Sequence, residues 1–440
     1  MTVSTFWCEQ AWIDPGRLAA RVRGDVAAGR VTALTEDAEP GDAQRLRGFV
    51  LPGLANAHSH AFHRALRGRA QGGTGSFWTW RKAMYTVAER LDPDSYLRLA
   101  TAVYAEMALA GITCVGEFHY LHHDPGGTPY ADPNVMQAAL AEAASAAGIR
   151  ITLLDTCYLT GGIGAPLDGV QVRFGDGDAE RWAARAADRE AAPHVRLGAA
   201  VHSVRAVPAD QLATVALAAS GAPLHVHLSE QPAENDACLA AHGRTPTALL
   251  DEHGVLRPST VAVHATHLTD EDVAVLVGSG ADVCFCPTTE RDLADGIGPA
   301  HRLLDADAEL SLGSDSHAVI DVLAEARALE LDERLATGER GRFDVPALLE
   351  AATVNGHRAL GWAAAGRLRV GAEADLVAIR LDSVRTAGGD DPAATAVFAA
   401  TAADVTDVVV GGSPVVREGV HLRVPDVGHA LSEAIGALYG

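Results

Sequence analysis

Short apolar, β-branched runs alternate eight times with Ala- and Leu-rich stretches of helical pattern between residues 49 and 365 of this 440-residue chain. The runs are FVLPGLAN, ITCVGEFHY, IRITLLDT, VRLGAAVH, PLHVHLSE, TVAVHATH, DVCFCPTT and ELSLGSDS. Continuous apolar runs of this length are typical of strands that are buried on both faces of a parallel sheet. Eight strand–helix units in succession predict an α/β fold, a (β/α)8 TIM barrel.

The stretch before the second run shows the helical pattern most clearly. Leu97, Ala100, Tyr104 and Met107 recur at a spacing of three or four residues, which places them on one face of a helix. Asp94 precedes this apolar face and is the expected N-cap.

Two segments lie outside the predicted barrel, which we expect over residues 50–365. Residues 1–49 contain short strand-like pieces such as RVTAL. Residues 366–440 contain GRLRVGAEADLVAIRLD and VTDVVVGGSPVVREG, in which apolar residues alternate and glycines mark turns. Since neither segment is large enough to bury a core alone, we expect one small β-sandwich domain formed jointly by both termini.

The charge of the chain limits its partners. A formal net charge of −22 at pH 7 argues against nucleic acid and against an anionic membrane surface, because both require basic patches.

The N-terminal residues MTVSTFWCEQAW lack the basic and apolar regions of a secretory signal. No uncharged apolar stretch of about 18 residues is found, so we expect no membrane span and a cytoplasmic protein.

Several catalytic classes are excluded by missing motifs. Lys82 is the only lysine, which removes a Walker A loop and any Schiff-base lysine at another position. The chain also lacks the G-x-S-x-G motif of serine hydrolases and a Gly-rich turn after the first run, as dinucleotide binding requires.

Histidines and carboxylates fall where the predicted strands end. Barrel enzymes place their chemistry at the carboxyl ends of their strands, and a random scatter of 19 histidines would not select these positions. The residues concerned are His58 and His60 (first run), His225, His227 and Glu230 (fifth), His264 and His267 (sixth) and Asp315 (eighth).

This arrangement predicts a metal site. His58 and His60 are two residues apart, so at an extended strand end both imidazoles point to the same side. A lone H-x-H is weak evidence, because it also occurs in polar loops, but His227 and Asp315 supply two further ligands from other strand ends. Neutral imidazole suits zinc, and a catalytic zinc keeps one position open for water.

Other residues near the predicted ligands have possible roles in proton transfer. Glu230 lies three residues beyond His227, which is the place for a proton shuttle, although an acid there can instead complement a helix dipole. His264 is expected to act as an electrophile or as a hydrogen-bond partner of Asp315 and the water. For His225 and His267 we favour roles in packing.

These motifs resemble those of the amidohydrolase superfamily over essentially the whole chain. PGLANAHSHAF and GRLRVGAEADLVAI are similar to its two terminal signatures, and the absence of a lysine at the fourth strand matches its mononuclear, deaminase-like branch. The resemblance implies one Zn²⁺ per chain, with Fe²⁺ or Mn²⁺ as other candidates, and a homodimer. It implies that the ion activates a water for attack, with Glu230, His264 and Asp315 as catalytic residues.

Four further segments resemble the formimidoylglutamate deiminases of this superfamily: SFWTWRKAMY, GEFHYLHH, AAVHSVRAVP and CPTTERDLADGI. The resemblance implies hydrolysis of N-formimidoyl-L-glutamate to N-formyl-L-glutamate and ammonia, in histidine degradation. It also implies that Arg81, Tyr120, His202 and Arg205 line the substrate pocket. Arg81 and Arg205 are expected in loops at the catalytic face, where guanidinium groups bind the two carboxylates of such a small dicarboxylate substrate.

Two features of these segments leave alternatives open. His63 occupies a position where glutamine is expected in much of the family, and we expect its ring to take over the contact to the substrate. The aromatic FWTW stretch, residues 77–80, is expected as a loop that either covers the site or packs on the barrel rim.

Other functions remain open from the sequence. A related deaminase acting on guanine, cytosine or an adenosine derivative would use the same metal site, although paired arginines favour a carboxylate over a neutral base. A non-catalytic metal-binding barrel is the alternative from a different class, and loss of a ligand would favour it, but none of the expected ligands is missing.

Overall fold

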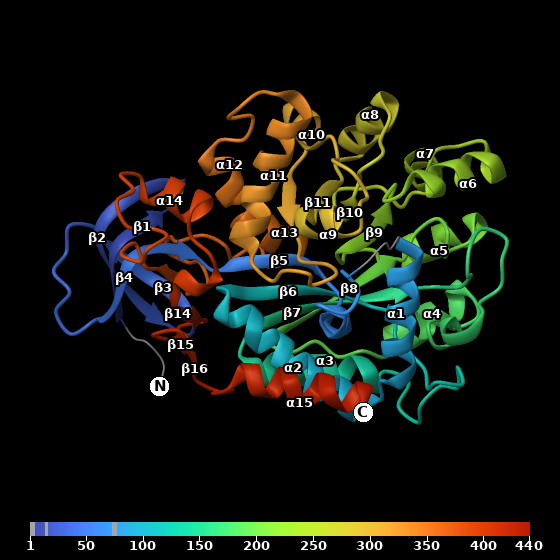
Figure 1. Cartoon of the computed structure of the whole chain (residues 1–440), viewed down its shortest axis with the longest axis horizontal. Coiled ribbons are helices and arrows are strands. Elements are labelled where there is room, and N and C mark those ends of the chain that lie inside the picture. The colour runs from blue at the N-terminus through green and yellow to red at the C-terminus, as the bar shows by residue number, and fades with distance from the viewer. Residues whose placement is uncertain (1–4, 14–15, 73–76) are drawn as a thin grey trace.

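Eight parallel strands form a barrel, as predicted, in the computed structural model, which describes residues 5–13, 16–72 and 77–440 (Figure 1). The strands pair in chain order, and an isolated bridge between Ser59 and Asp315 joins the first strand to the segment after the last. Every residue of the first three strands is buried, which explains why their sequences are apolar without alternation. The barrel strands are β5 (Leu54–Ser59), β6 (Ile112–His119), β7 (Arg150–Cys157), β8 (Val195–Val201), β9 (Leu224–Leu228), β10 (Thr260–His264), β11 (Asp282–Phe285) and β12 (Leu310–Leu312).

The first predicted run, FVLPGLAN, is divided between two sheets. Phe49–Pro52 is the end of β4 in the second sheet, and only the residues after Gly53 enter the barrel. A Cβ at Gly53 would lie 2.2 Å from Oγ1 of Thr113, so the chain passes from one sheet to the other at a point without room for a side chain. The prediction of one continuous strand is therefore wrong, and the expected domain boundary at residue 49 falls inside β4.

The second sheet is mixed and is built from both termini, in the order β16-β15-β14-β13-β4-β1-β2-β3. β4 pairs in parallel with β1 and antiparallel with β13. The N-terminal strand β4 and the C-terminal strand β13 are therefore neighbours in the middle of this sheet. Figure 1 shows this sheet beside the barrel. Its strands are β1 (Thr5–Ile13), β2 (Arg17–Ala27), β3 (Arg30–Thr35), β4 (Gln44–Pro52), β13 (Leu376–Ile379), β14 (Val405–Val410), β15 (Ser413–Arg417) and β16 (Val420–His421).

The helices surround the barrel (Figure 1). The helix predicted before the second run is α2, but its N-cap is Asp92, whose side chain accepts a hydrogen bond from Ser95 N, and not Asp94. Among the described residues, no helix is both long enough and apolar enough to cross a lipid bilayer. The α-helices are α1 (Phe77–Arg90), α2 (Pro93–Leu109), α3 (Val135–Ala147), α4 (Ala179–Ala187), α5 (Ala209–Ala218), α6 (Pro232–His242), α7 (Pro246–Glu252), α8 (Asp270–Ser279), α9 (Pro287–Asp292), α10 (Ala300–Asp305), α11 (Val322–Thr337), α12 (Val345–Glu350), α13 (Gly356–Ala359), α14 (Pro392–Phe398) and α15 (Val427–Tyr439). Shorter helical turns are η1 (Ala61–Leu66), η2 (Gly169–Arg173), η3 (Ala351–Asn355) and η4 (Ala402–Asp404).

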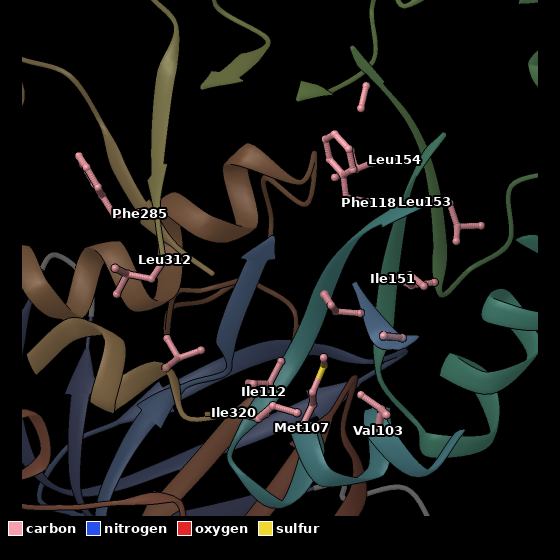
Figure 2. Packing of buried hydrophobic residues seen from close by; sticks show 14 of the residues in the cluster. Val103, Met107, Ile112, Phe118, Ile151, Leu153, Leu154, Phe285, Leu312 and Ile320 are labelled. Atoms are coloured by element: carbon pink, nitrogen blue, oxygen red, sulfur yellow. The ribbon is translucent and has the colours of Figure 1, made fainter. Parts of the chain in front are cut away.

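One large hydrophobic cluster joins the strands to the helices that cover them. Figure 2 shows Val103 and Met107 of α2 beside Ile112 of β6 and Ile151 of β7. Phe118, near the carboxyl end of β6, belongs to the same cluster and is buried. The core therefore extends up to the strand ends, where it supports the polar residues described next.

Candidate metal centre and substrate pocket

Four side chains converge at the carboxyl ends of the barrel strands. Nε2 of His58 lies 3.1 Å from Nε2 of His227, and Oδ1 of Asp315 lies 3.2 Å from Nε2 of His60. Each of the four residues offers one ligand atom, these atoms all lie within 4.8 Å of one another, and all four residues are buried. A tetrahedral site with metal–ligand distances of about 2.0–2.1 Å places its ligand atoms about 3.3 Å apart. The spacing therefore fits one small cation.

Backbone contacts between the end of β5 and the segment after β12 set the positions of these ligand atoms. Asp315 N donates a hydrogen bond to His58 O at 3.0 Å, and His60 N donates to Asp315 O at 3.3 Å. A Cβ at Gly313 would lie 2.8 Å from Cβ of His58, so a glycine is required for the two segments to come this close. Asp315 itself has a φ of +36°, an unusual conformation for a residue other than glycine. Such strain is concentrated at functional sites.

The protonation states of the cluster are those of metal ligands. Burial lowers the pKa of His58 to about 3 and holds that of His227 well below its usual value, so both rings are neutral. Burial alone would raise the pKa of Asp315, but the rings of His58 and His60, whose Nε2 atoms lie 3.4 and 3.2 Å from its Oδ1, hold it well below its usual value. Nδ1 of His60 donates to Phe118 O at 2.9 Å, which leaves Nε2 as a lone-pair donor. Neutral imidazoles and a carboxylate are ligands that suit zinc.

Glu230 and His264 lie beside the cluster, at the ends of β9 and β10. Both strands end in tight backbone turns, with φ values of +48° at Ser229 and +70° at His264. Nε2 of His264 is 3.9 Å from Oε1 of Glu230 and 3.9 Å from Oδ2 of Asp315. The imidazole of His264 thus lies between the carboxylates of Glu230 and Asp315, and a small movement would bring it within hydrogen-bond distance of either one.

Glu290 determines the charge of His264. Burial would lower the pKa of His264, but the Glu290 carboxylate, 3.3 Å from Nδ1, together with Glu230 and Asp315, raises it well above its usual value. Glu290 is itself held by Cys286 N, which donates to it at 2.8 Å. These carboxylates therefore favour the protonated form of His264, which can donate from Nε2 toward the centre of the site.

A cavity of about 50 Å³ lies against this cluster. All five residues predicted to bind substrate line it, together with five of the other predicted site residues. A second cavity of about 250 Å³ adjoins the first and shares with it Arg81, Tyr158, His202 and Arg205. The predicted site residues on the wall of the first cavity are His60, His63, Arg81, Tyr120, His202, Arg205, His227, Glu230, His264 and Asp315.

Contacts with neighbouring side chains hold the predicted substrate-binding residues in place. Nε2 of His63 lies 3.1 Å from the hydroxyl of Tyr120, and Nδ1 of His202 lies 3.2 Å from the hydroxyl of Ser203. Nε of Arg81 donates to the hydroxyl of Tyr85 at 2.6 Å. Burial holds the pKa values of His63 and His202 well below their usual value, so both rings are neutral.

Arg205 contacts two carboxylates at once. Its Nε donates to Oε2 of Glu234 at 3.1 Å and its NH2 group donates to Oε2 of Glu230 at 3.3 Å. Glu234 is only 1% exposed, so this is a buried ion pair rather than a solvated surface contact. Arg205 therefore lies on the cavity wall and at the same time contacts Glu230 and Glu234.

The expected loop at residues 77–80 is instead the first turn of α1, and Arg81 lies in this helix rather than in a loop. The Trp80 ring packs edge-on against His63, with centroids 5.0 Å apart, on the cavity wall. Met84, one helical turn later, lines the same wall, which explains why the stretch is helical. The side chains of Phe77 and Trp78 lie outside the described part of the structure, so the proposed cover is not tested for them.

Two histidines at strand ends lie apart from the cavity wall. Nε2 of His225 donates to Ala359 O at 3.3 Å, and Nε2 of His267 donates to Asp295 O at 2.8 Å. These contacts agree with the packing roles that we favoured for them. Glu234, Glu290 and Tyr158 were not predicted from the sequence, although Glu234 is one helical turn beyond Glu230 and could have been tested as its neighbour.

Comparisons with known proteins agree with the fold and with the resemblance noted in the sequence. The model of the amidohydrolase family matches residues 49–415. Formimidoylglutamate deiminase of Pseudomonas aeruginosa is 40% identical over 454 aligned positions, which cover 99% of this chain and 100% of that protein. The 8-oxoguanine deaminase of the same organism is 33% identical and covers 85% of this chain and 83% of its own length.

A solved structure, that of an amidohydrolase from Brucella melitensis, has the same fold. It superposes with a TM-score of 0.91 at 34% sequence identity, over 99% of this chain and 100% of that one. The similarity thus extends over the barrel and the second sheet together.

Proposed function

The chain belongs to the amidohydrolase family, and on that premise we propose that it hydrolyses N-formimidoyl-L-glutamate to N-formyl-L-glutamate and ammonia, in histidine degradation. One observation carries the proposal: a single cavity is lined by three of the four residues of the His/Asp cluster, by Glu230 and by the two arginines Arg81 and Arg205. The relatives indicate a hydrolase that acts on C–N bonds, and the arginines favour a substrate with carboxylates.

We assign one Zn²⁺ per chain to His58, His60, His227 and Asp315, with Fe²⁺ or Mn²⁺ as other candidates. Three imidazoles, of which His58 and His227 are neutral, and one carboxylate, with ligand atoms 3.1–3.4 Å apart in three of their contacts, support this assignment. When bound in such a site, the ion would lower the pKa of a coordinated water to about 7, which would supply hydroxide at neutral pH.

The carboxylates and His264 handle protons. Hydrolysis adds the oxygen of water to the formimidoyl carbon and breaks the bond from that carbon to its terminal nitrogen. Glu230 takes the proton that the water loses and delivers it to the departing nitrogen, so that ammonia leaves rather than an amide anion. Asp315 can also accept a proton from the water through Oδ2. The imidazolium of His264, 3.9 Å from Oδ2, donates toward the attacking oxygen and stabilises the charge that develops there.

Arg81 and Arg205 bind the two carboxylates of the substrate in this proposal. Their guanidinium groups border both cavities, so a ligand whose formimidoyl group lies in the small cavity can extend its carboxylates into the larger one. Tyr120 and His202 complete the wall, and His63 contacts the substrate from the side of His60. Two planar guanidinium groups give the site donors that suit carboxylates, in a chain whose net charge is −22.

Deamination of a purine or pyrimidine base is the second candidate, because the 8-oxoguanine deaminase similarity favours it. A base deaminase would share the metal cluster, Glu230 and His264, and would differ in the residues that face the rest of the substrate. A neutral base offers no carboxylate that Arg81 and Arg205 could bind, which is why we prefer the dicarboxylate.

The experiment that tests the proposal is ammonia release by the purified, zinc-loaded protein on N-formimidoyl-L-glutamate, with guanine, 8-oxoguanine and cytosine in parallel. We expect release with the dicarboxylate alone and N-formyl-L-glutamate as the second product. Release from a base would replace the substrate and keep the metal mechanism. Absence of release from all four compounds by protein with one zinc per chain would overturn the proposed reaction.

A further inference from the structure

The first and last strands of the barrel meet at a seam that carries three of the four residues assigned to the metal. His58 and His60 lie on the β5 side of the seam, and Asp315 lies on the other side, three residues after β12. The backbone pairing across the seam near the metal consists of one isolated bridge, between Ser59 and Asp315. A shift of one side against the other therefore changes the distances between ligand atoms directly.

A chain of three buried side chains crosses the same seam. The hydroxyl of Ser59 lies 2.9 Å from Oε2 of Glu117, on β6, and 3.0 Å from Nε2 of His317, two residues after Asp315. One hydroxyl donates one hydrogen bond and accepts another, so Ser59 satisfies both neighbours at once. Glu117, Ser59 and His317 are each 0% exposed.

Glu117 holds the β5 side of this chain at two points. Its Oε2 contacts Ser59, and its Oε1 accepts a hydrogen bond from Ala61 N at 2.7 Å. The two contacts lie on either side of His60 in the sequence. The carboxylate thus fixes the backbone that carries this ligand, without touching the ligand ring.

His317 is fixed on the other side of the seam. Nε of Arg67 donates to His317 O at 2.7 Å, which ties this residue to the segment after η1. His317 has a φ of +57°, a left-handed conformation that most side chains disfavour and that persists where surrounding contacts impose it. The ring is thereby directed across the seam to Ser59.

Within the described part of the structure, the ring of His58 lacks the hydrogen bond that usually fixes a metal-bound imidazole, as does the ring of His227. Metal-bound imidazoles usually donate their second ring nitrogen to a carbonyl or carboxylate, which fixes the ring. Nδ1 of His58 is buried and has no hydrogen-bond partner among the described residues, whereas Nδ1 of His60 donates to Phe118 O. The position of the His58 ring therefore depends on its backbone, and Ser59 is the next residue.

We propose that Glu117, Ser59 and His317 are positioning residues for the metal, because their hydrogen-bonded chain sets the spacing of His58 and His60 relative to Asp315. The proposal rests on the metal-dependent function proposed above, but not on the identity of its substrate. A role in stability alone would lower the thermal midpoint of the variants and leave their metal affinity unchanged. A positioning role changes the affinity itself and the geometry of the bound ion.

The test is to measure zinc affinity by competition with a chromophoric chelator for Ser59→Ala and His317→Asn. Asn is chosen because it tolerates a positive φ, so that this variant keeps the backbone of the wild type. We expect the dissociation constant to rise by about 10–100-fold in each variant, which is the usual effect of removing a partner that orients a metal ligand. The double variant should lose no more affinity than the weaker-binding single variant, because Ser59 is the link through which His317 acts.

Thr152→Val is the matched control. The hydroxyl of Thr152 is also buried in a barrel strand, donates to Leu360 O at 2.7 Å and accepts from Nε1 of Trp362 at 3.0 Å, away from the metal cluster. We expect Thr152→Val to lower the thermal midpoint but to keep zinc affinity within about twofold of wild type. The visible absorption of the cobalt-loaded proteins gives a second readout, which should differ from wild type for Ser59→Ala and His317→Asn and match it for Thr152→Val.

The outcomes separate the two proposals. Zinc affinity and cobalt absorption equal to wild type in both seam variants would overturn the positioning role and leave the proposed function standing. A wild-type protein that binds no zinc would overturn the metal-dependent function and, with it, the positioning role. Because the measurement involves no substrate, inactivity on N-formimidoyl-L-glutamate does not affect it.

Discussion

Oε2 of Glu234 accepts a hydrogen bond from Nε of Arg205 at 3.1 Å, and the glutamate is buried in the first turn of α6. Oε1 of the same carboxylate accepts from Ser229 N at 3.3 Å, directly before Glu230. Burial raises the pKa of Glu234, while the nearby guanidinium opposes this shift. One carboxylate therefore supports both a predicted substrate-binding residue and the turn that presents the proposed proton shuttle.

Replacing Arg205 with alanine should affect binding and stability separately. Loss of a charge-assisted contact to a substrate carboxylate is expected to cost about 1.5–3 kcal/mol, so KM should rise by roughly 10–150-fold. The variant also leaves Glu234 buried without its cation, which should lower the free energy of unfolding by about 3–5 kcal/mol. Steady-state kinetics and urea unfolding at pH 7 measure the two effects.

The double variant Arg205→Ala/Glu234→Gln is the control for this prediction. It removes the uncompensated buried charge, so most of the lost stability should return while KM stays high. If KM returned to the wild-type value together with stability, Arg205 would act only through the fold, and its place in substrate binding would be lost.

Glu230→Gln should keep the metal and lose turnover. The ligands are unchanged and the amide still accepts a hydrogen bond from Arg205, but it cannot carry a proton, so kcat should fall by about 10²–10⁴-fold. The measurements are zinc content per chain and kcat on N-formimidoyl-L-glutamate. Glu252→Gln, at an exposed position on α7, is the control and should resemble wild type. Turnover near the wild-type rate in zinc-loaded Glu230→Gln would exclude the shuttle role.

The barrel could be predicted from the sequence because two independent patterns mark its strands. Buried strands read as apolar runs, and polar residues such as His58, His227 and Asp315 follow them at one end. The transition at Gly53 could not be predicted, because the apolar residues before and after it form one continuous run. Which sheet a buried strand joins depends on contacts that are distant in sequence, such as that of Gly53 N with Asp375 O.

The motifs in the sequence indicated the ligands and part of the cavity wall, but not Tyr158 and not the residues that hold the site in place. Glu290 fixes the charge of His264, and Glu117 reaches Ser59 from a neighbouring strand, through contacts between residues 26 and 58 positions apart. A carboxylate in the sequence does not show which cation or hydroxyl it will meet.

Acid should unfold this protein in part through the buried ion pair of Asp155 and Arg185, whose closest contact is 2.8 Å. Burial would raise the pKa of Asp155, but Arg185 outweighs it and holds the pKa well below its usual value. Because the folded-state pKa is depressed, the pair stabilises the fold above the unfolded pKa of about 3.9, and this stability is lost as the pH falls further.

Asp155→Asn therefore should lower the free energy of unfolding at pH 7 by about 3–5 kcal/mol and should flatten its decrease between about pH 4 and pH 2. Urea unfolding across this pH range gives the comparison. Asp382→Asn, which breaks an exposed pair with Arg380, should change the free energy of unfolding by less than about 1 kcal/mol. An equal pH dependence in wild type and Asp155→Asn would show that other groups govern acid unfolding.

Removal of the metal should destabilise the wild type and leave a ligand variant unaffected. An ion that binds only the folded chain stabilises it by about 4.1 kcal/mol at a concentration 1,000 times its dissociation constant, so a chelator should lower the urea midpoint. In His227→Ala the cluster lacks one of its four ligands, and the midpoint should be lower and nearly independent of chelator.

His225→Gln supplies the comparison that separates a ligand from an ordinary buried histidine. His225 lies on the same strand, two residues earlier, and its Nε2 donates to Ala359 O rather than facing the cluster. This variant should lose stability yet respond to chelator as the wild type does. If His225→Gln lost its response to chelator and His227→Ala kept it, the ion would be bound nearer the amino end of β9, and the assignment of His227 as a ligand would have to be abandoned.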